Sequence, residues 1–172
     1  MEGHVSPVTY TIPDDADIGH VHLKVADLER ALGFYCGVLG FTLMQRFGDQ
    51  AAFVSAGGYH HHLGLNTWDS RGGAPPPTGS TGLYHTAIRF PTRRDLAVAV
   101  ARVLDAGISL SGASDHGVSE AIYLDDPDGN GVELYWDRPR EHWPPATTPG
   151  ERVGMYSRRL DMAALLALAA TK

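Results

Sequence analysis

The chain has 172 residues, of which 43% are hydrophobic and 20% are charged, and its formal net charge is −6. These values are typical of a globular protein with its own core. The absence of a Lys/Arg cluster and of a long apolar run argues against binding to nucleic acid or a membrane. Cys36 is the single cysteine, which excludes an internal disulfide. Because the first residues lack a secretory signal pattern, we expect a cytoplasmic protein.

An internal repeat sets the expected architecture. The segment GHVHLKVADLERALGFYCGVLG aligns with YHTAIRFPTRRDLAVAVARVLDAG, so that His20 falls on His85. Each copy begins with an alternating pattern that predicts a strand and continues with a helical pattern. In the first copy Asp27 suits the helix N-cap and Gly40 its C-cap. Three short extended stretches joined by Gly-containing turns follow in each copy. The sequence therefore predicts an α+β fold in which two βαβββ modules form one cupped mixed sheet.

We expect a single domain over residues 1–172. Its expected parts are module one (about 17–68), a Gly/Pro/Ser/Thr-rich linker (69–82), module two (about 83–139) and a C-terminal tail with a short helix (140–172). The helix begins near Leu160 and is apolar, so we expect it to pack on the domain or on a second subunit.

Alternation along the strands predicts which polar side chains enter the cup. When the aliphatic residues of each strand face the helices, His20, His85 and Glu133 face inward from the first, fifth and last strands. An inward carboxylate is costly unless it is paired or ligated. Two imidazoles and one carboxylate match the facial arrangement that binds Fe(II) and leaves positions open for substrate and oxygen. We therefore predict a metal site; the alternative is a pair of hydrogen-bonded core histidines and a surface carboxylate.

Other side chains are candidates for catalysis. The same alternation directs Tyr123, His60 and His62 inward, whereas His61 faces away unless a bulge re-aims it. At most two of the three consecutive histidines can face one pocket, and solvent-facing histidines at a strand end are the alternative for the others. His116 lies in a loop ahead of the strand with Tyr123, from which it could reach over the pocket mouth.

The chain resembles the vicinal oxygen chelate superfamily in four ordered blocks, GHVHLKVADLERALGFYCGVLGF, YHHHLGLNTW, GLYHTAIRFP and DHGVSEAIYLDDPDGNGVELYWDRP. More narrowly, it is similar to the ring-cleaving extradiol dioxygenase branch, the catechol-2,3-dioxygenase-like proteins. The resemblance extends roughly from Ile18 to Pro139. Many extradiol enzymes carry four βαβββ units, so a chain with two resembles the compact single-domain members.

The resemblance also implies a role for each candidate residue. Carried over position by position, the family pattern gives metal ligands at His20, His85 and Glu133, an active-site tyrosine at Tyr123 and, with a shift, a further histidine at His116. The family's acid/base histidine falls in the pair His61 and His62. The hydrophobic pattern favours His61, and the facing argument favours His62, which is our choice.

The function implied by the resemblance is that of a metal-dependent extradiol-type dioxygenase acting on a catechol-like aromatic substrate and O2. Fe(II) is the expected metal, with Zn, Ni and Mn as alternatives. One alternative function is a glyoxalase-type metal-dependent lyase or isomerase, which needs a fourth, acidic or amide ligand where this chain has histidine. The other is a drug-binding resistance protein. The apolar tail helix and related family members predict a homodimer.

Overall fold

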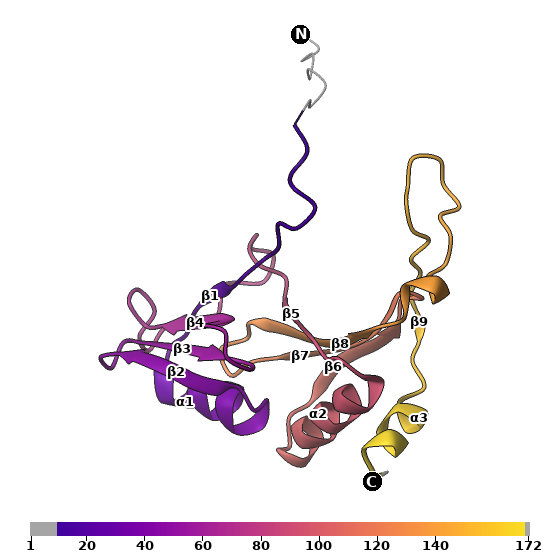
Figure 1. Ribbon diagram of the computed structural model, residues 1–172. Helices are drawn as coiled ribbons and strands as arrows, with labels where there is room; N and C mark the ends of the chain where they lie inside the picture. Colours follow the sequence, from indigo (N-terminus) through magenta and orange to yellow (C-terminus); the bar gives the residue numbers. More distant parts are fainter. Residues whose placement is uncertain (1–9, 171–172) are drawn as a thin grey trace.

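The computed structural model describes residues 10–170, and residues 1–9 and 171–172, the ends of the predicted domain, lie outside the described part. Figure 1 shows two groups of strands, each with a helix against one face. The first group consists of β1 (Val21–Lys24), α1 (Leu28–Leu32), the π-helix η1 (Gly33–Val38), β2 (Thr42–Phe47), β3 (Ala51–Ser55) and β4 (Leu63–Asn66). The second consists of β5 (Thr86–Arg89), α2 (Arg93–Asp105), β6 (Leu110–Asp115), β7 (Ser119–Asp125) and β8 (Gly131–Asp137). The predicted βαβββ order is confirmed in both groups.

Module one forms a sheet of order β1-β4-β3-β2, in which β1 runs parallel to β4. In β1, Leu23 is buried and its neighbours on either side are exposed, as alternation predicts. The carboxylate of Asp27 caps α1 by accepting a hydrogen bond from the Arg30 amide at 2.9 Å. The predicted helix is present, but its second half widens into η1, where Gly33 and Gly37 lower the propensity for regular α-helix.

Module two forms a sheet of order β5-β8-β7-β6-β9, in which β5 runs parallel to β8 and β9 (Arg158–Arg159) is added from the tail. The Thr92 hydroxyl caps α2 by accepting a hydrogen bond from the Asp95 amide at 3.1 Å. Leu96, Val100 and Val103 follow at helical spacing and are fully buried. The helix therefore covers one face of the sheet and leaves the other face for the site.

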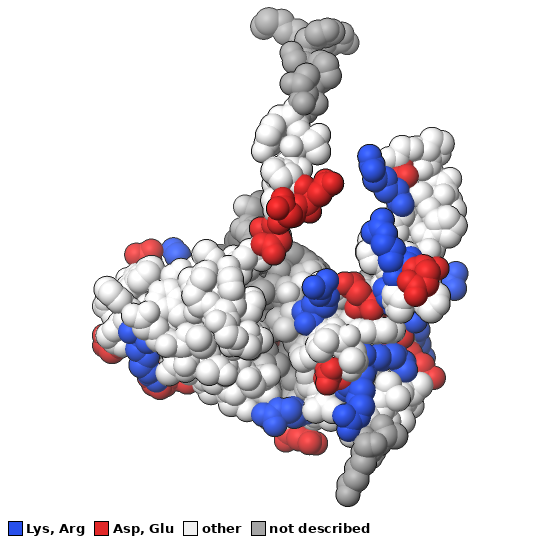
Figure 2. Space-filling view, in the orientation of Figure 1, with Lys and Arg blue, Asp and Glu red and all other residues white. Residues whose placement is uncertain are grey.

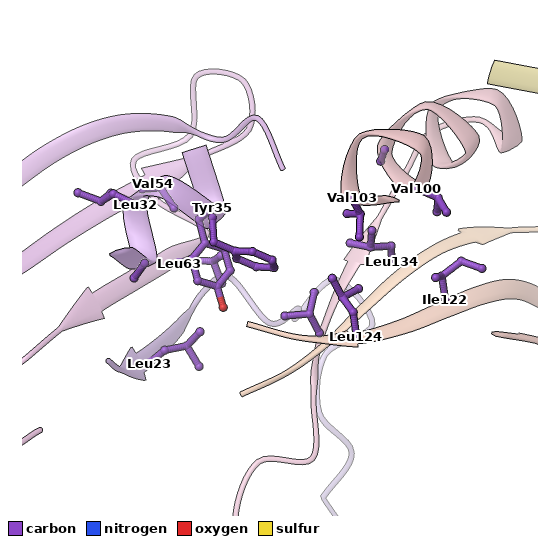
Figure 3. Close-up of a cluster of buried hydrophobic side chains, with 14 of the residues drawn as sticks. Leu23, Leu32, Tyr35, Val54, Leu63, Val100, Val103, Ile122, Leu124 and Leu134 are labelled. Atoms are coloured by element: carbon purple, nitrogen blue, oxygen red, sulfur yellow. The ribbon is translucent and has the colours of Figure 1, made fainter. Parts of the chain in front are cut away.

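The two sheets share one hydrophobic core. Figure 3 shows Leu23 and Tyr35 of module one in the same cluster of buried side chains as Val100, Leu124 and Leu134 of module two. The expected fold class is confirmed, but the expectation of one continuous sheet is not met. Within residues 10–170, backbone pairing gives separate sheets of four and five strands, because β1 pairs with β4, and β5 with β8.

Polar contacts join the modules where β1 ends. The Ala26 amide donates a hydrogen bond to the Asp128 carboxylate at 3.0 Å, and Arg30 forms an ion pair with the same carboxylate at 2.6 Å. The Tyr35 hydroxyl donates to the Asp126 carboxylate at 3.0 Å. Because Asp126 and Asp128 belong to the turn between β7 and β8, this turn connects the end of β1 to the start of β8.

The C-terminal tail returns to the body after a projecting segment. It contains the 3-10 helix η2 (Arg140–His142), the strand β9, the helix α3 (Met162–Ala167) and the 3-10 helix η3 (Leu168–Ala170). As expected, the helix is present and packs on the domain, against α2, where Leu160 and Leu165 are buried. Figure 2 shows acidic side chains on the N-terminal segment, which holds Asp14, Asp15 and Asp17, and basic side chains over the tail. In the described part, every helix is too short or too polar to span a bilayer.

Candidate active site

Four predicted site residues of module two form a continuous series of polar contacts. The Nε2 atom of His85 lies 2.8 Å from Oε2 of Glu133. The Tyr123 hydroxyl lies 3.3 Å from Oε1 of the same carboxylate, and 2.8 Å from Nε2 of His116. The structure therefore brings together His85, Glu133, Tyr123 and His116, which come from four different parts of module two.

Strand register explains why these side chains meet. Tyr123 of β7 pairs directly with Glu133 of β8, and Glu133 pairs with Ala87 of β5. Directly opposed residues share a face, and so do residues two apart along a strand, so His85 lies on the same side as Ala87. The neighbours Leu124 and Leu134 are buried on the opposite face. The alternation predicted for module two is thus the one observed.

Burial and charge determine the protonation of Tyr123. Burial, followed by the nearby Glu133 carboxylate, raises the pKa of Tyr123 to about 12. A phenol with this pKa keeps its proton at neutral pH, so Tyr123 acts as a hydrogen-bond donor in the site.

The pair His85 and Glu133 fits two adjacent ligands of a divalent cation. Donor atoms that share one cation at about 2.1 Å are roughly 3 Å apart, which is close to the 2.8 Å separation of His85 Nε2 and Glu133 Oε2. The other ring nitrogen of His85, Nδ1, is buried without a hydrogen-bond partner. The outer hydrogen bond that usually orients a ligating imidazole is thus not formed at His85, and the fit to a cation rests on the spacing of Nε2 and the mostly buried Glu133 carboxylate.

The structure places His20 apart from this pair. Its ring lies 4.5 Å from the ring of His61 and 6.4 Å from that of His60, all in module one. Over residues 10–170, no group of three His, Cys, Asp or Glu side chains is placed to hold one metal ion. The physical reason is the direction of β1. The modules meet at the end of the strand, at and beyond Lys24, whereas His20 precedes its start. Along an extended chain, His20 is therefore about 13 Å from Lys24.

Of the three consecutive histidines, His60 and His61 stay in contact, with their Nδ1 atoms 2.7 Å apart, whereas His62 turns away from them. His61 lies between His20 and Phe53, with ring centroids 4.5 and 5.0 Å apart. His62 instead turns its Nδ1 toward the Ser55 hydroxyl at 2.9 Å and accepts a hydrogen bond from the Ala56 amide at 3.3 Å. The alternation that directed His60 and His62 inward assumed a continuous strand through these positions, but β4 begins only at Leu63. A bend ahead of the strand re-aims His61 toward His20.

A cavity of about 610 Å³ lies beside His85 and Tyr123. Its wall includes residues that sequence reasoning did not select, among them Pro76 of the linker, Leu83 and Tyr84 at the start of module two, and Gly112 of β6. Loop geometry, which alternation cannot supply, brings the linker over the site. Of these wall residues, Tyr84 could have been found from the sequence, because it directly precedes the candidate ligand His85. A second cavity of about 560 Å³ adjoins His62.

Comparison with known proteins gives the family. The family model described as "Glyoxalase/Bleomycin resistance protein/Dioxygenase superfamily" matches residues 17–134. The chain is 45% identical over 133 residues to catechol-2,3-dioxygenase of Bacillus subtilis (strain 168), covering 77% of this chain and 46% of that protein. It is 35% identical over 121 residues to biphenyl-2,3-diol 1,2-dioxygenase 3 of Rhodococcus globerulus, covering 70% of this chain and 63% of that protein.

The chain thus spans about half to two thirds of the length of these relatives. A glyoxalase/dioxygenase crystal structure from Nostoc punctiforme shares the fold, with a TM-score of 0.63 at 19% identity, covering 78% of this chain and 100% of that one. The matched segment contains both modules up to Leu134 and includes His20, His85 and Glu133. The chain therefore belongs to the glyoxalase/bleomycin resistance protein/dioxygenase superfamily.

Proposed function

We propose that the protein is a metal-dependent extradiol-type dioxygenase that cleaves a catechol-like aromatic ring with O2 in the cytoplasm. The observation that carries the proposal is the polar series His85, Glu133, Tyr123 and His116. In this series the candidate metal ligands His85 and Glu133 contact Tyr123 and, through it, His116, which could carry protons. The series lies beside a cavity whose volume is within the usual range for small-molecule sites. The names of the two dioxygenase relatives support the same class of reaction.

Fe(II) is the metal we propose, with His85, Glu133 and His20 as its ligands, because two imidazoles and a carboxylate suit non-haem iron. Bound there, the metal would supply Lewis acidity and open positions for a catechol and oxygen. Zn, Ni and Mn can occupy ligand sets of this kind, so metal identity is one outcome of the test below.

The chain's own residues would orient the substrate and move protons. Tyr123, which keeps its proton at neutral pH, would donate a hydrogen bond to a substrate oxygen. We assign the acid/base role to His61 rather than His62, because His61 lies against His20. Burial, followed by the charge of His20, lowers the pKa of His61, which keeps its imidazole neutral and able to accept a proton.

We further propose that His20 reaches the pair His85 and Glu133 from a second copy of the chain, in a homodimer. This is supported by the division of candidate residues between the modules, since His20 and His61 lie in one and His85 and Glu133 in the other. In such a dimer each site would combine module one of one chain with module two of its partner.

Mixed dimers test where His20 comes from. Co-expressed His20→Ala and Glu133→Ala chains would regain about a quarter of wild-type activity if each site draws on both chains, because half of random dimers then contain one intact site. Mixtures that stay as inactive as either variant alone would show that His20 acts within its own chain.

The reaction itself is tested by anaerobic reconstitution. Metal-free protein is loaded separately with Fe(II), Mn(II), Zn(II) or Ni(II), then mixed with catechol and O2, while oxygen uptake and the absorbance of the ring-opened semialdehyde are followed. We expect turnover with Fe(II). His85→Ala and Glu133→Ala should abolish metal retention, whereas His142→Ala, an exposed tail histidine, should not change it. Turnover of a hemithioacetal with Zn or Ni, and none of catechol, would replace the proposal with the glyoxalase reaction.

A further inference from the structure

The tail crosses the turn that carries His116. The Tyr156 amide donates a hydrogen bond to the His116 carbonyl at 3.2 Å, and Nδ1 of His116 lies 2.9 Å from the Tyr156 carbonyl. The following residues form β9, which pairs with the end of β6 next to the turn. His116 is therefore held by the backbone of the tail through both its main chain and its ring.

Packing fixes the tail at this place. Gly117 has φ +78, and a Cβ there would lie 2.6 Å from the Tyr156 ring and 2.8 Å from Pro144. The turn is held from its other side by Asp115, whose carboxylate accepts a hydrogen bond from the Gly117 amide at 2.8 Å and pairs with Arg138 at 3.0 Å. Glycine is thus required at position 117 for backbone conformation and for the close approach of the tail.

The contact with Tyr156 determines which ring nitrogen of His116 carries the proton. A carbonyl oxygen only accepts hydrogen bonds, so Nδ1 of His116 must be the donor. In a neutral imidazole Nε2 is then an acceptor, and the nearest donor is the Tyr123 hydroxyl at 2.8 Å. Tyr123 has one hydroxyl proton and a second possible acceptor, the Glu133 carboxylate at 3.3 Å. The tautomer of His116 therefore decides whether the Tyr123 hydroxyl donates its proton to His116 or to Glu133.

We propose that the C-terminal segment around Tyr156 is a positioning element that holds His116 in its Nδ1-protonated form and so directs the Tyr123 proton away from Glu133. With the opposite tautomer, Nε2 of His116 would donate to Tyr123, and the hydroxyl proton would turn to Glu133. This inference rests on the proposed function, in which Glu133 is a metal ligand and must stay free of a competing proton.

The first test reads the tautomer directly in metal-free protein. Nitrogen-15 NMR of the histidine side chains distinguishes a protonated Nδ1 from a protonated Nε2, and loss of a signal in His116→Gln assigns it. We expect His116 to carry its proton on Nδ1. In Gly117→Ala the displaced tail should release the ring, and the proton should move to Nε2, the form that free histidine favours. A wild-type His116 protonated on Nε2 overturns the proposal.

A matched variant separates tail displacement from backbone strain. Gly107 has φ +73, and a Cβ there would meet nothing within 4 Å, so Gly107→Ala carries the same conformational cost without moving the tail. A second variant that should displace the tail is Gly154→Ala, whose Cβ would lie 2.2 Å from the Pro145 carbonyl, outside the His116 turn; it and Gly117→Ala are called the tail variants below. We expect both tail variants, and not Gly107→Ala, to shift the tautomer. An unchanged tautomer in folded tail variants, as judged by circular dichroism, contradicts the proposal.

Kinetics supply an independent readout. With Fe(II)-loaded protein we expect the tail variants to lower kcat by about ten- to a hundredfold, with a smaller change in KM, as for misplaced catalytic groups. If Gly107→Ala lowers kcat as much as the tail variants do, the loss comes from general instability, and the proposal is overturned. If wild-type protein cleaves no catechol, the proposed reaction fails, and the tail's hold on His116 is then decided by NMR alone.

Discussion

The hydroxyl of Tyr35 donates a hydrogen bond to the carboxylate of Asp126, 3.0 Å away across the boundary between the modules. Burial, followed by the Asp126 charge, raises the pKa of Tyr35, so the phenol stays a donor at any ordinary pH. Asp126 also accepts hydrogen bonds from the Asp128 and Asn130 amides. One buried carboxylate thus fixes both the β7–β8 turn and its contact with module one.

Removing this hydroxyl should weaken the contact between the modules. We expect Tyr35→Phe to lower the free energy of unfolding by about 1.5 kcal/mol, the lower range for a hydrogen bond to a charged group, because Asp126 keeps its other donors. Urea denaturation measures the change. Tyr10→Phe, at a side chain that is 73% exposed, is the control. Equal midpoints for both variants would contradict a role for the Tyr35 hydroxyl.

A buried ion network should contribute more. Glu120 is 3% exposed and pairs with Arg93 at 2.7 Å and with Arg138 at 3.0 Å. We expect Glu120→Gln to cost about 3 kcal/mol of unfolding free energy, since it removes the carboxylate that pairs with Arg93 and leaves Arg138 with Asp115 alone. The exposed Glu151→Gln should change it little. If thermal melting temperatures coincide for the two variants, the network is not stabilising.

The Tyr123 pKa should report the charge of Glu133. Metal-free Glu133→Gln loses the carboxylate that contributes to the value of about 12, so the Tyr123 pKa should fall toward its ordinary value. Ultraviolet titration of the phenolate measures it, and Tyr123→Phe identifies the tyrosine. The surface variant Glu141→Gln should leave the titration unchanged. A Tyr123 pKa that stays near 12 without Glu133 would assign the whole shift to burial.

Stability should decline on the acid side of pH 6.5. Burial is the largest cause of the lowered pKa of His22 and of His61, and the charge of His20 adds to both. A lowered folded-state pKa means that the unfolded chain binds more protons, so these groups contribute stability above about pH 6.5 that is lost as pH falls through the folded values. Melting temperatures of metal-free protein between about pH 8 and pH 5 should therefore decrease. His22→Gln combined with His61→Gln should flatten that decrease, and an equally steep decrease would assign it to other groups.

Sequence patterns predicted the parts of the site that depend on strand alternation. Glu133 and Tyr123 share a face because their strands are regular and their register is direct. The same reasoning fails at His61 and His62, which precede the strand and follow a bend. Alternation has no meaning where the backbone is not extended.

Other features of the structure could not be predicted from the local sequence pattern. Whether β1 and β5 pair with each other depends on how the modules pack, which periodicity does not encode. The tail contact with His116 is made by the backbone carbonyl of Tyr156, a group that every residue carries, so no residue type could indicate it. The resemblance of the four sequence blocks, by contrast, identified the family, because ordered motifs over both modules are far more specific than any single histidine.

The shared core of the two sheets has a consequence for how the duplicated chain behaves on heating. Within residues 10–170 no backbone ladder runs between the sheets, yet their buried side chains form one cluster. Opening either half would expose the apolar flank of the other to water. We therefore expect the two halves of the repeat to unfold in a single transition rather than as independent cooperative units.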